Sequence, residues 1–435
     1  MSFISHDAHP RRSLAVIFAS WKGLMLAISL VTALGSDYDT SASLFFDVAY
    51  GPSGPSPSAL ASRLTKWDAL YFMHAAHDDY VYEQEWAFGV GLPWTVKALL
   101  RAGRSLGLAA DGVVEPVLAI LIAHVSHLVA VLALYELTML VFASKRLAFV
   151  TSVLHTISPA GLFLSAPYAE SPTACLSFIG NLLFALSLKQ GDASLARHVA
   201  QVGAGAAFGL ATLFRSNAIL GGLLFAVEAL KCLGAFIHGP SLRKLLNIIA
   251  PVVGGFCVLA GTIVPQALAW MRYCLVDLTD MEPRPWCAGL IPSIYTFVQS
   301  HYWNVGFLRY WTPGNIPLFF LAGPVLALLI TSAMEVLRGG PLQPARSLML
   351  VPAEPYRLFV QTLAVGQLLL AALALTSYHV QIITRLASGY PLWYWWIASS
   401  LSSKESSSWG RSSTVFMIMY GTIQGVLFAS FLPPA

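Results

Sequence analysis

Residues 113–142 read VVEPVLAILIAHVSHLVAVLALYELTMLVF, and the only charged side chains in this run are Glu115 and Glu136. About 20 consecutive apolar residues are enough for an α-helix to cross the hydrocarbon core of a bilayer. The same composition extends along the chain: of its 435 residues, 57% are hydrophobic and only 11% are charged. Because ordinary soluble domains carry roughly 25% charged residues, these values exclude a soluble globular enzyme and a disordered chain. They predict an all-α integral membrane protein.

Further apolar runs of similar length predict the path of the chain through the membrane. The predicted spans are Leu14–Leu34, Val113–Phe142, Leu147–Ser165, Pro172–Leu188, Val199–Phe214, Ala218–Leu230, Leu246–Met271, Pro317–Leu337, Leu358–Tyr378, Gln381–Ala398 and Thr414–Phe431. With the N-terminus in the cytosol, most Lys and Arg residues lie on the cytosolic side, as the positive-inside rule requires. Two long loops, residues 35–112 and 272–316, then lie on the far side of the membrane. We expect the functional site to lie in these loops. The chain is predicted to form a single membrane domain that covers residues 1–435. The net charge of +4 and the lack of long Lys/Arg runs give no indication of a nucleic-acid partner.

The first long loop combines aromatic side chains with carboxylates. Residues 92–108 have apolar residues at helical spacing, interleaved with basic ones, which predicts an amphipathic helix on the membrane surface. Trp67-Asp68 and Tyr82-Glu83 precede it in the same loop. Aromatic faces stack on sugars, and a carboxylate can accept a proton from a hydroxyl, so a carbohydrate site is one interpretation. The other is a solvated loop whose aromatic residues anchor in the lipid headgroups.

Asp37-Tyr38-Asp39 follows the first predicted span directly. Two carboxylates at this spacing can bind a divalent cation that holds a phosphate-linked donor. Polar residues at the end of a helix also need no special explanation, so the pattern leaves a metal role open.

Ionisable residues at the edges of apolar runs form a second group of candidates. Glu170 follows Ser158–Ala169, a segment with two prolines that predicts a backbone break at the bilayer surface. Arg215 interrupts the apolar run 199–230 and is followed by Ser216 and Asn217. An arginine there is costly, and its guanidinium is suited to grip a phosphate. The alternatives are an exposed loop carboxylate for Glu170 and an arginine that snorkels to the surface for Arg215.

The remaining candidate functional residues lie in the second long loop and in the segment after residue 378. The loop contains Pro285-Trp286-Cys287 and the aromatic-rich stretch Tyr302–Trp311, which reads YWNVGFLRYW and includes Arg309. This stretch is either an amphipathic segment in the interface or the wall of a groove for a lipid and a sugar. Beyond the next two spans come His379, Gln381 and Arg385, which do not share one helical face, so this segment is expected to be partly unwound.

Taken in order, these segments resemble one family. The resemblance rests on Trp67-Asp68, Tyr82-Glu83, Ala87-Phe88, Ser158-Pro159, Tyr168, Glu170, Arg215-Ser216-Asn217, Pro285-Trp286-Cys287, Tyr302-Trp303-Asn304-Val305-Gly306-Phe307-Leu308, His379-Val380-Gln381 and Arg385. It covers nearly the whole chain and points to the GPI mannosyltransferase 2 family, also called phosphatidylinositol-glycan class V. The stretch Tyr302–Leu308 is its most specific part.

The resemblance implies a multi-span glycosyltransferase of the GT-C type in the endoplasmic reticulum membrane, with a lumenal active site. It implies transfer of the second mannose, in α-1,6 linkage, from dolichol phosphate mannose to the glycolipid precursor of the GPI anchor. Some members of the family work with a small membrane partner subunit, and nothing in this sequence identifies where such a subunit would dock. The resemblance implies no firm cofactor and leaves a divalent metal uncertain.

The reaction that the resemblance implies assigns provisional roles to the candidates. A β-linked donor and an α-linked product require inversion at the anomeric carbon, and therefore a general base and a cationic site for the leaving phosphate. We expect Asp68 to be the base, with Glu83 as its rival, and Arg215, Arg309 or Arg385 to hold the phosphate. The remaining candidates for substrate binding are Trp67, Glu83, Tyr168, Glu170, Asn217, Tyr302, Trp303, Asn304, His379 and Gln381.

The five cysteines include no CxxC pair, so no zinc or redox motif is present. Cys274 and Cys287 are the two in the second long loop, and in the oxidising compartment that the resemblance implies they are expected to form a disulfide. Other classes of protein remain as alternatives. A multi-span lipid transporter should show related halves, which we do not find, and a scaffold subunit would not need an intramembrane arginine. A different transferase that uses a dolichol-linked sugar would be distinguished by its acceptor.

The predicted orientation can be tested by glycosylation, because the sequence has no Asn-x-Ser/Thr acceptor of its own. Changing Pro55→Asn together with Pro57→Thr creates one in the first long loop. If that loop is lumenal, we expect a gel-mobility shift that endoglycosidase H removes. The pair Gln190→Asn and Asp192→Thr creates the same acceptor in a predicted cytosolic connection and should give no shift. The reverse result would show that the orientation is wrong.

Overall fold

The computed structural model describes residues 8–35, 37–107, 112–192, 194–275, 284–339, 352–402 and 407–433. All regular secondary structure in these ranges is helical, either α or 3-10, and they contain no strand. The prediction of an all-α protein is confirmed.

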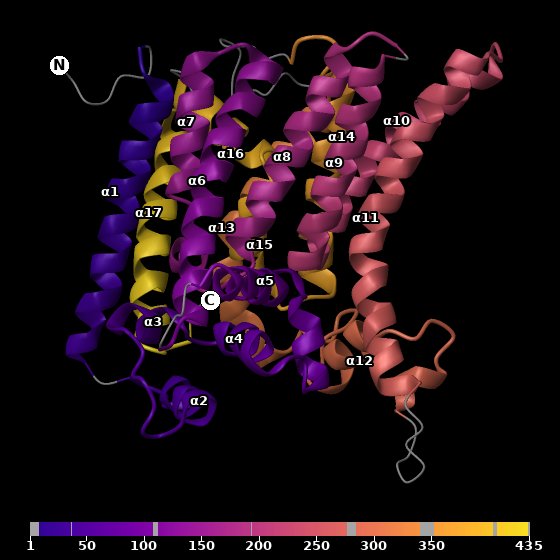
Figure 1. Ribbon diagram of the computed structural model, residues 1–435. Coiled ribbons are helices and arrows are strands. Elements are labelled where there is room, and N and C mark those ends of the chain that lie inside the picture. The colour runs from indigo at the N-terminus through magenta and orange to yellow at the C-terminus, as the bar shows by residue number, and fades with distance from the viewer. Residues whose placement is uncertain are drawn as a thin grey trace.

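Eight helices in the described ranges are long and apolar enough to cross a membrane. Figure 1 shows them running in roughly the same direction, side by side. They are α1 (Pro10–Val31), α6 (Glu115–Phe142), α8 (Glu170–Lys189), α10 (Gly222–Ile237) together with the 3-10 helix Ser216–Gly221 that precedes it, α11 (Leu242–Cys274), α13 (Ile316–Leu337), α14 (Arg357–Thr376) and α17 (Ser407–Ala429). Each corresponds to one predicted span.

The predicted span Val199–Phe214 is a continuous helix, α9 (Leu195–Phe214), which packs between α8 and α11. It is long enough to cross a membrane but is not one of the eight. Its first turns carry Arg197, His198 and Gln201, and these polar side chains lower its mean hydropathy.

Two other predicted spans, Leu147–Ser165 and Gln381–Ala398, are wrong as continuous helices. The first is α7 (Lys145–Thr156) followed by a 3-10 turn at Gly161–Leu164. The second is a chain of short elements: 3-10 turns at Val380–Ile382 and Ala387–Gly389 flank α15 (Ile383–Leu386), and α16 (Leu392–Ser402) follows. Pro159 and Pro391 stand between the pieces, where a proline disfavours continuation of a helix.

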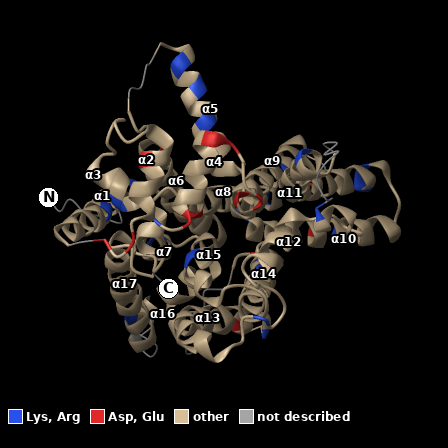
Figure 2. Cartoon of the chain, turned by 90° about the horizontal axis from the view of Figure 1, so that it is seen from below, with Lys and Arg blue, Asp and Glu red and all other residues tan. Residues whose placement is uncertain are grey.

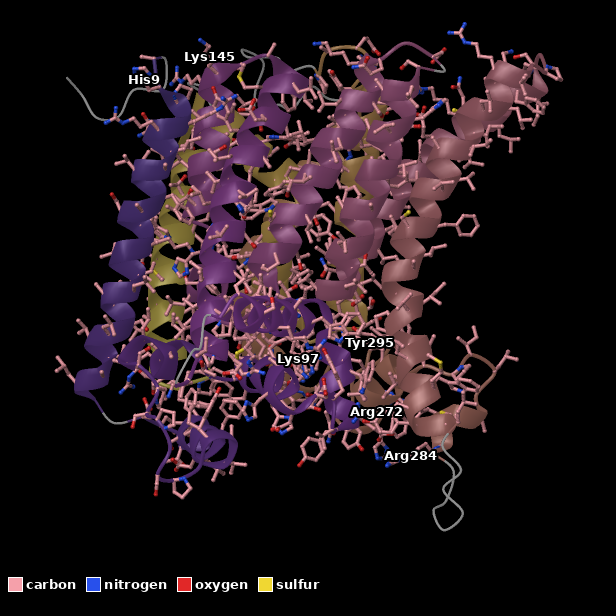
Figure 3. The ribbon with its side chains drawn as sticks, in the orientation of Figure 1. His9, Lys97, Lys145, Arg272, Arg284 and Tyr295 are labelled. Atoms are coloured by element: carbon pink, nitrogen blue, oxygen red, sulfur yellow. A yellow bond between two sulfur atoms is a disulfide. The ribbon has the colours of Figure 1, made fainter. Side chains whose placement is uncertain are left out.

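The long loops gather at one end of the helices, which we call the loop end. Short helices α2 (Ser41–Tyr50), α3 (Ala59–Leu64), α4 (Ala69–Asp78) and α12 (Ile294–His301) lie there together with α5 (Gly91–Ser105). Figure 3 labels Arg272, Arg284 and Tyr295 at this end and His9 and Lys145 at the opposite one. The start of α1 and the described parts of the two long loops are thus on opposite sides of the bundle.

Helix α5 corresponds to the amphipathic helix predicted at residues 92–108, of which Leu108 lies outside the described residues. Figure 1 shows α5 lying across the direction of the spanning helices, and in Figure 2 its basic bands project from the edge of the bundle. Leu92 and Val96 are buried against the protein, whereas Leu99 and Leu106 are exposed. This placement suits a helix in the plane of the membrane surface.

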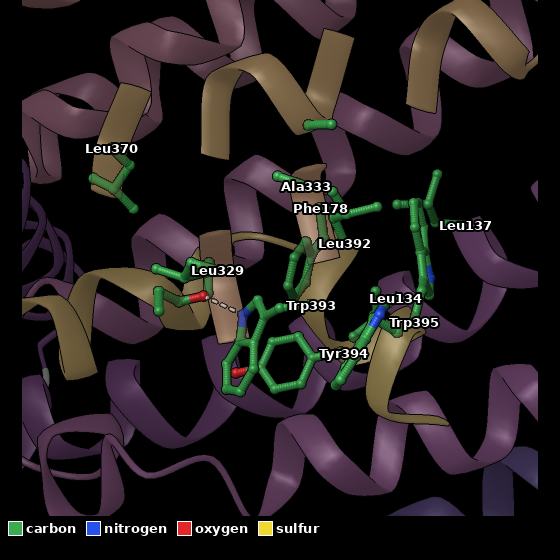
Figure 4. Packing of buried hydrophobic residues seen from close by; sticks show 14 of the residues in the cluster. Leu134, Leu137, Phe178, Leu329, Ala333, Leu370, Leu392, Trp393, Tyr394 and Trp395 are labelled. Atoms are coloured by element: carbon green, nitrogen blue, oxygen red, sulfur yellow. Dashed lines mark hydrogen bonds between the residues drawn. The ribbon is translucent and has the colours of Figure 1, made fainter. Parts of the chain in front are cut away.

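Aromatic residues of α16 form the centre of the largest core cluster (Figure 4). Trp393, Tyr394 and Trp395 are fully buried. The indole N–H of Trp395 donates to Thr138 Oγ1 at 2.8 Å, and that of Trp393 donates to the carbonyl of Ala387 at 2.9 Å. Both polar groups are therefore satisfied inside the bundle, as the absence of water in a bilayer core requires.

The break between α7 and α8 is also satisfied internally. Residues 158–175 are buried throughout. The Nζ of Lys22, on α1, donates to the carbonyl of Leu164 and to Ser165 Oγ, both at 2.7 Å, and Ser171 Oγ donates to the Leu164 carbonyl at 2.9 Å. A buried lysine thus supplies hydrogen bonds that the broken backbone would otherwise lack.

Helices α9 and α11 approach so closely that glycine is required where they touch. A Cβ atom on Gly205 would overlap the backbone of Gly254, and one on Gly209 would overlap the carbonyl of Cys257. Small residues on facing helices allow this contact, which is a common basis of helix association in membranes. The close approach fixes the ends of both helices beside each other at the loop end.

We expect Gly205→Ala to destabilise the protein by about 1–3 kcal/mol, because the added methyl group must push α9 and α11 apart. Gly203→Ala on the same helix is the matched control, since its Cβ would meet only Leu183 Cδ1 at an ordinary 3.6 Å. Thermal unfolding in detergent measures both. Equal melting temperatures for the two variants would contradict the tight contact.

Candidate active site

Asp68 lies at the loop end, immediately before α4. Trp67 has a φ of 56°, a left-handed conformation that turns the chain sharply just before Asp68. Asp68 Oδ2 accepts a hydrogen bond from Arg385 Nη1 at 2.9 Å. The carboxylate is still partly exposed, so it is accessible from the cavity described below.

Arg385 belongs to α15, the four-residue helix within the broken segment after α14. Its guanidinium carbon lies 4.6 Å from the ring centre of Phe163 and 5.7 Å from that of Tyr168. Its Nε lies 3.8 Å from Glu170 Oε1. Burial opposes the positive charge, but the carboxylates of Asp68 and Glu170 outweigh it and raise the pKa of Arg385. The guanidinium is therefore a permanent cation held between two acids and two aromatic faces.

Glu170 also joins Arg385 to Arg215. It is the first residue of α8, and its Oε1 forms an ion pair with Arg215 Nη2, just beyond the end of α9. Glu170 Oε2 and Arg215 Nε are both buried without a hydrogen-bond partner. Because a buried unpaired donor is costly, the unused N–H of Arg215 indicates a place for an anionic ligand.

These groups surround a cavity of about 600 Å³ at the loop end, a volume typical of ligand sites. Three charged side chains line it: Asp68, Arg215 and Arg385. The aromatic lining consists of Tyr71, Trp86, Phe88, Phe214, Tyr295, Trp303 and Tyr378. The neutral polar lining consists of Thr212, Ser216, Asn217, Thr262, Gln266, Ser293, Thr296, Gln299, His379 and Gln381.

Two of the lining side chains have pKa values that keep them neutral. Burial, reinforced by the charge of Asp68, raises the pKa of the Tyr71 hydroxyl. Burial lowers the pKa of His379, although the charge of Asp68 opposes that shift. A neutral tyrosine and a neutral imidazole beside Asp68 can donate hydrogen bonds to a substrate without adding charge.

The structure places Asp68, Arg215, Arg385, Asn217, Trp303, His379 and Gln381 together in the cavity lining. Other residues singled out from the sequence lie elsewhere. Glu170 and Tyr168 are buried behind the two arginines and do not line the cavity. Trp67 packs against Phe431, with ring centres 5.1 Å apart, and Arg309 and Asn304 are exposed outside the cavity.

Glu83 connects the two long loops and does not line the cavity. Its carboxylate accepts hydrogen bonds from Trp286 Nε1 at 2.9 Å and from Tyr302 Oη at 3.0 Å. Arg284 Nη1 lies 3.6 Å away. The side chain is only 5% exposed, and each of its two oxygens already accepts a hydrogen bond from the protein. In this position Glu83 and Tyr302 hold the second loop against the first.

The disulfide strengthens the same region. Cys274, the last residue of α11, is bonded to Cys287, and their Cα atoms are 5.7 Å apart. These are the two cysteines expected to pair from the sequence. The bond ties the end of α11 to the start of the second loop, next to Trp286 and Glu83.

The Asp37 and Asp39 carboxylates are both engaged by protein groups. Asp37 forms ion pairs with Arg63 and with Lys66, the latter at 2.8 Å. Asp39 Oδ1 accepts from the backbone N–H of Ser41 at 2.6 Å, at the start of α2. Among the described residues no group of three or more His, Cys, Asp or Glu is arranged to hold a metal ion.

Sequence reasoning missed several lining residues, some of which left a signal. Tyr71 lies one helical turn after Asp68, so the two share a face of α4. Thr262 and Gln266 are four residues apart within an apolar span, and polar side chains on one face of a span indicate a cavity. Ser293, Thr296 and Gln299 gave no such signal, because their helix is short and lies in a loop.

The structure is thus an all-α membrane bundle with a polar and aromatic cavity at its loop end. The family model described as mannosyltransferase (PIG-V) matches residues 15–435. The chain therefore belongs to the PIG-V family of mannosyltransferases and is a glycosyltransferase.

Curated relatives match along their whole length. GPI mannosyltransferase 2 of Gibberella zeae is 54% identical, covering 100% of both chains. The proteins of the same name from Chaetomium globosum and Aspergillus oryzae are 46% and 41% identical, each covering 98% of this chain and 97% and 96% of their own. Among solved structures, the oligosaccharyltransferase of Archaeoglobus fulgidus matches with a TM-score of 0.42 and 13% identity, covering 95% of this chain and 56% of its own. At that level the likeness says nothing about the site.

Proposed function

We propose that this chain transfers the second mannose, in α-1,6 linkage, from dolichol phosphate mannose to the GPI-anchor precursor in the lumen of the endoplasmic reticulum. Membership of the PIG-V family and the names of the curated relatives support mannosyl transfer in GPI synthesis. The observation that carries the proposal is the meeting of one carboxylate, Asp68, with two guanidiniums, Arg215 and Arg385, in one cavity. The loop end would then be lumenal, and residues 1–435 would act as one membrane domain.

The proposed reaction is a single in-line displacement. The acceptor hydroxyl attacks the anomeric carbon of the donor mannose and gives its proton to a general base. The bond from that carbon to the phosphate oxygen breaks, and dolichol phosphate leaves with the electron pair. Configuration inverts from β to α, and one base and one anion-binding site are sufficient.

Asp68 is the group best placed to take the proton. It is the only carboxylate that lines the cavity among the described residues. Its hydrogen bond with Arg385 orients the carboxylate in the absence of substrate. Glu83, the rival base, is occupied by Trp286 and Tyr302.

Arg215 and Arg385 are the groups best placed to hold the phosphate. The phosphate gains negative charge as the bond to the sugar breaks, so fixed cations stabilise the transition state more than the bound donor. Glu170 fixes both guanidiniums from behind, and both arginines line the cavity. Arg309, the third candidate from the sequence, does not line the cavity.

Asp68→Asn should abolish transfer, with a loss of about 10²–10⁴-fold in kcat, because the amide keeps the size of the side chain but cannot accept the proton. Microsomes with labelled dolichol phosphate mannose and a one-mannose GPI acceptor provide the assay. Asp78→Asn, at the exposed far end of the same helix α4, is the matched control and should retain activity. If Asp68→Asn keeps near-normal turnover while Glu83→Gln loses it, the base is Glu83 instead.

Arg215→Lys and Arg385→Lys should each lower kcat/KM for the donor by about 10²-fold, because an ammonium lacks the planar fork that grips a phosphate. Steady-state rates at varied donor concentration measure this effect. Arg338→Lys, exposed at the opposite end of α13, is the control and should behave as the parent protein. A large loss in Arg309→Lys with normal rates in the other two would refute the assignment.

A further inference from the structure

One side of the cavity carries no charge. Five side chains form it: Thr262 and Gln266 of α11, and Ser293, Thr296 and Gln299 in or next to α12. We call this set the neutral wall. The charged residues of the cavity come from other parts of the chain, so the two sets are built on separate elements.

Gln266 has one end of its amide already occupied. Its Oε1 lies 3.3 Å from the backbone nitrogen of Tyr295, which can only donate, so this end must be the carbonyl oxygen. The same oxygen accepts from Ser293 Oγ at 3.1 Å. These contacts fix the orientation of the amide and leave its NH₂ group as the end available to a ligand.

Thr262 offers a hydroxyl that the protein does not use. Its Oγ1 is buried and has no hydrogen-bond partner. By contrast, Thr138, Thr212 and Thr362 in other long helices each donate to the carbonyl four residues earlier, at 2.7–2.9 Å. A buried hydroxyl without a partner is costly, and the Thr262 side chain lines the cavity, so we expect this hydroxyl to turn toward a ligand bound there.

Helix α12 completes the wall with its polar face. Ser293, Thr296 and Gln299 follow one another at intervals of three residues and line the cavity. Ile294 and Val298, on the opposite face, are fully buried in a cluster with Trp286. This packing, beside the Cys274–Cys287 disulfide, holds the polar face toward the cavity.

We propose that the neutral wall binds sugar hydroxyls of the glycan acceptor. This inference rests on the proposed function and adds the substrate subsite. Hydroxyls and amides pair well with sugar hydroxyls, and the rings of Tyr295 and Trp303 lie beside them in the same cavity. A phosphate is drawn instead to Arg215 and Arg385. The donor mannose is attached directly to its phosphate and therefore lies next to those arginines, which leaves the neutral wall to the acceptor.

The test separates the KM values for the two substrates. Thr262→Val and Gln299→Leu each remove hydrogen-bonding groups while keeping a similar size. Each should raise KM for the GPI-precursor acceptor roughly threefold to tenfold, the effect of losing one neutral hydrogen bond, and leave KM for dolichol phosphate mannose unchanged. Thr262→Ser keeps the hydroxyl that Thr262→Val removes, and its KM for the acceptor should therefore stay close to that of the parent protein. A merely structural role of Thr262 would not explain this difference between the two variants.

Matched controls are Thr422→Val on α17 and Gln361→Leu on α14; both side chains are half-buried and neither lines the cavity. Both should keep parental KM values for both substrates. An unchanged acceptor KM in Thr262→Val and Gln299→Leu, or a rise confined to the donor KM, would overturn the proposal. Failure of the proposed function is distinguishable, because the parent protein itself would then transfer no mannose from this donor to this acceptor.

Discussion

The charge pairing of Arg385 is the interaction on which the arrangement of the site depends. A guanidinium in a low-dielectric interior is costly unless it is paired, and removing one partner of a buried pair typically costs about 3–5 kcal/mol. Arg385 meets Asp68, which is 317 residues away in sequence, and also approaches Glu170. Glu170 is in turn paired with Arg215. One set of ion pairs therefore fixes four segments relative to one another: the first loop, the start of α8, the turn after α9 and the broken segment at α15.

The interruptions of the helices make this pairing possible. A continuous helix over Gln381–Ala398 would satisfy its own backbone, but it would not bring Arg385 across the loop end to Asp68. The short turns around α15 do so, and the segment between α7 and α8 supplies Phe163 and Tyr168 as faces for the guanidinium. Such irregular backbone is tolerated at membrane depth only where protein covers it and satisfies its polar groups. Lys22 does this for the carbonyl of Leu164.

The two long loops are joined by contacts that lie outside the cavity. Glu83 accepts hydrogen bonds from Trp286 and Tyr302 of the second loop, and the Cys274–Cys287 disulfide ties that loop to α11. These contacts fix α12, whose polar face is part of the neutral wall. Glu83, which contacts Trp286, thus has a structural role. Asp68, which follows Trp67 in sequence, has the chemical role in our proposal. The division follows from burial: Glu83 is enclosed by donors, and Asp68 remains partly exposed to the cavity.

The sequence by itself determined the class of the protein, because the cost of placing polar groups in a bilayer is local and can be read from each run of residues in turn. It thereby located the eight long helices, the two loops, the cysteine pair and most of the charged candidates. Only the tertiary structure decided that Leu147–Ser165 and Gln381–Ala398 are broken, since prolines inside apolar runs are compatible with either outcome until the packing around them is known. It also showed that Arg385 and Asp68 line the cavity whereas Arg309 and Glu83 do not. Asp68 and Glu83 have equally aromatic local sequences, and both arginines lie in or beside apolar sequence. What distinguishes the members of each pair is which distant side chains lie within about 3 Å, the reach of a hydrogen bond.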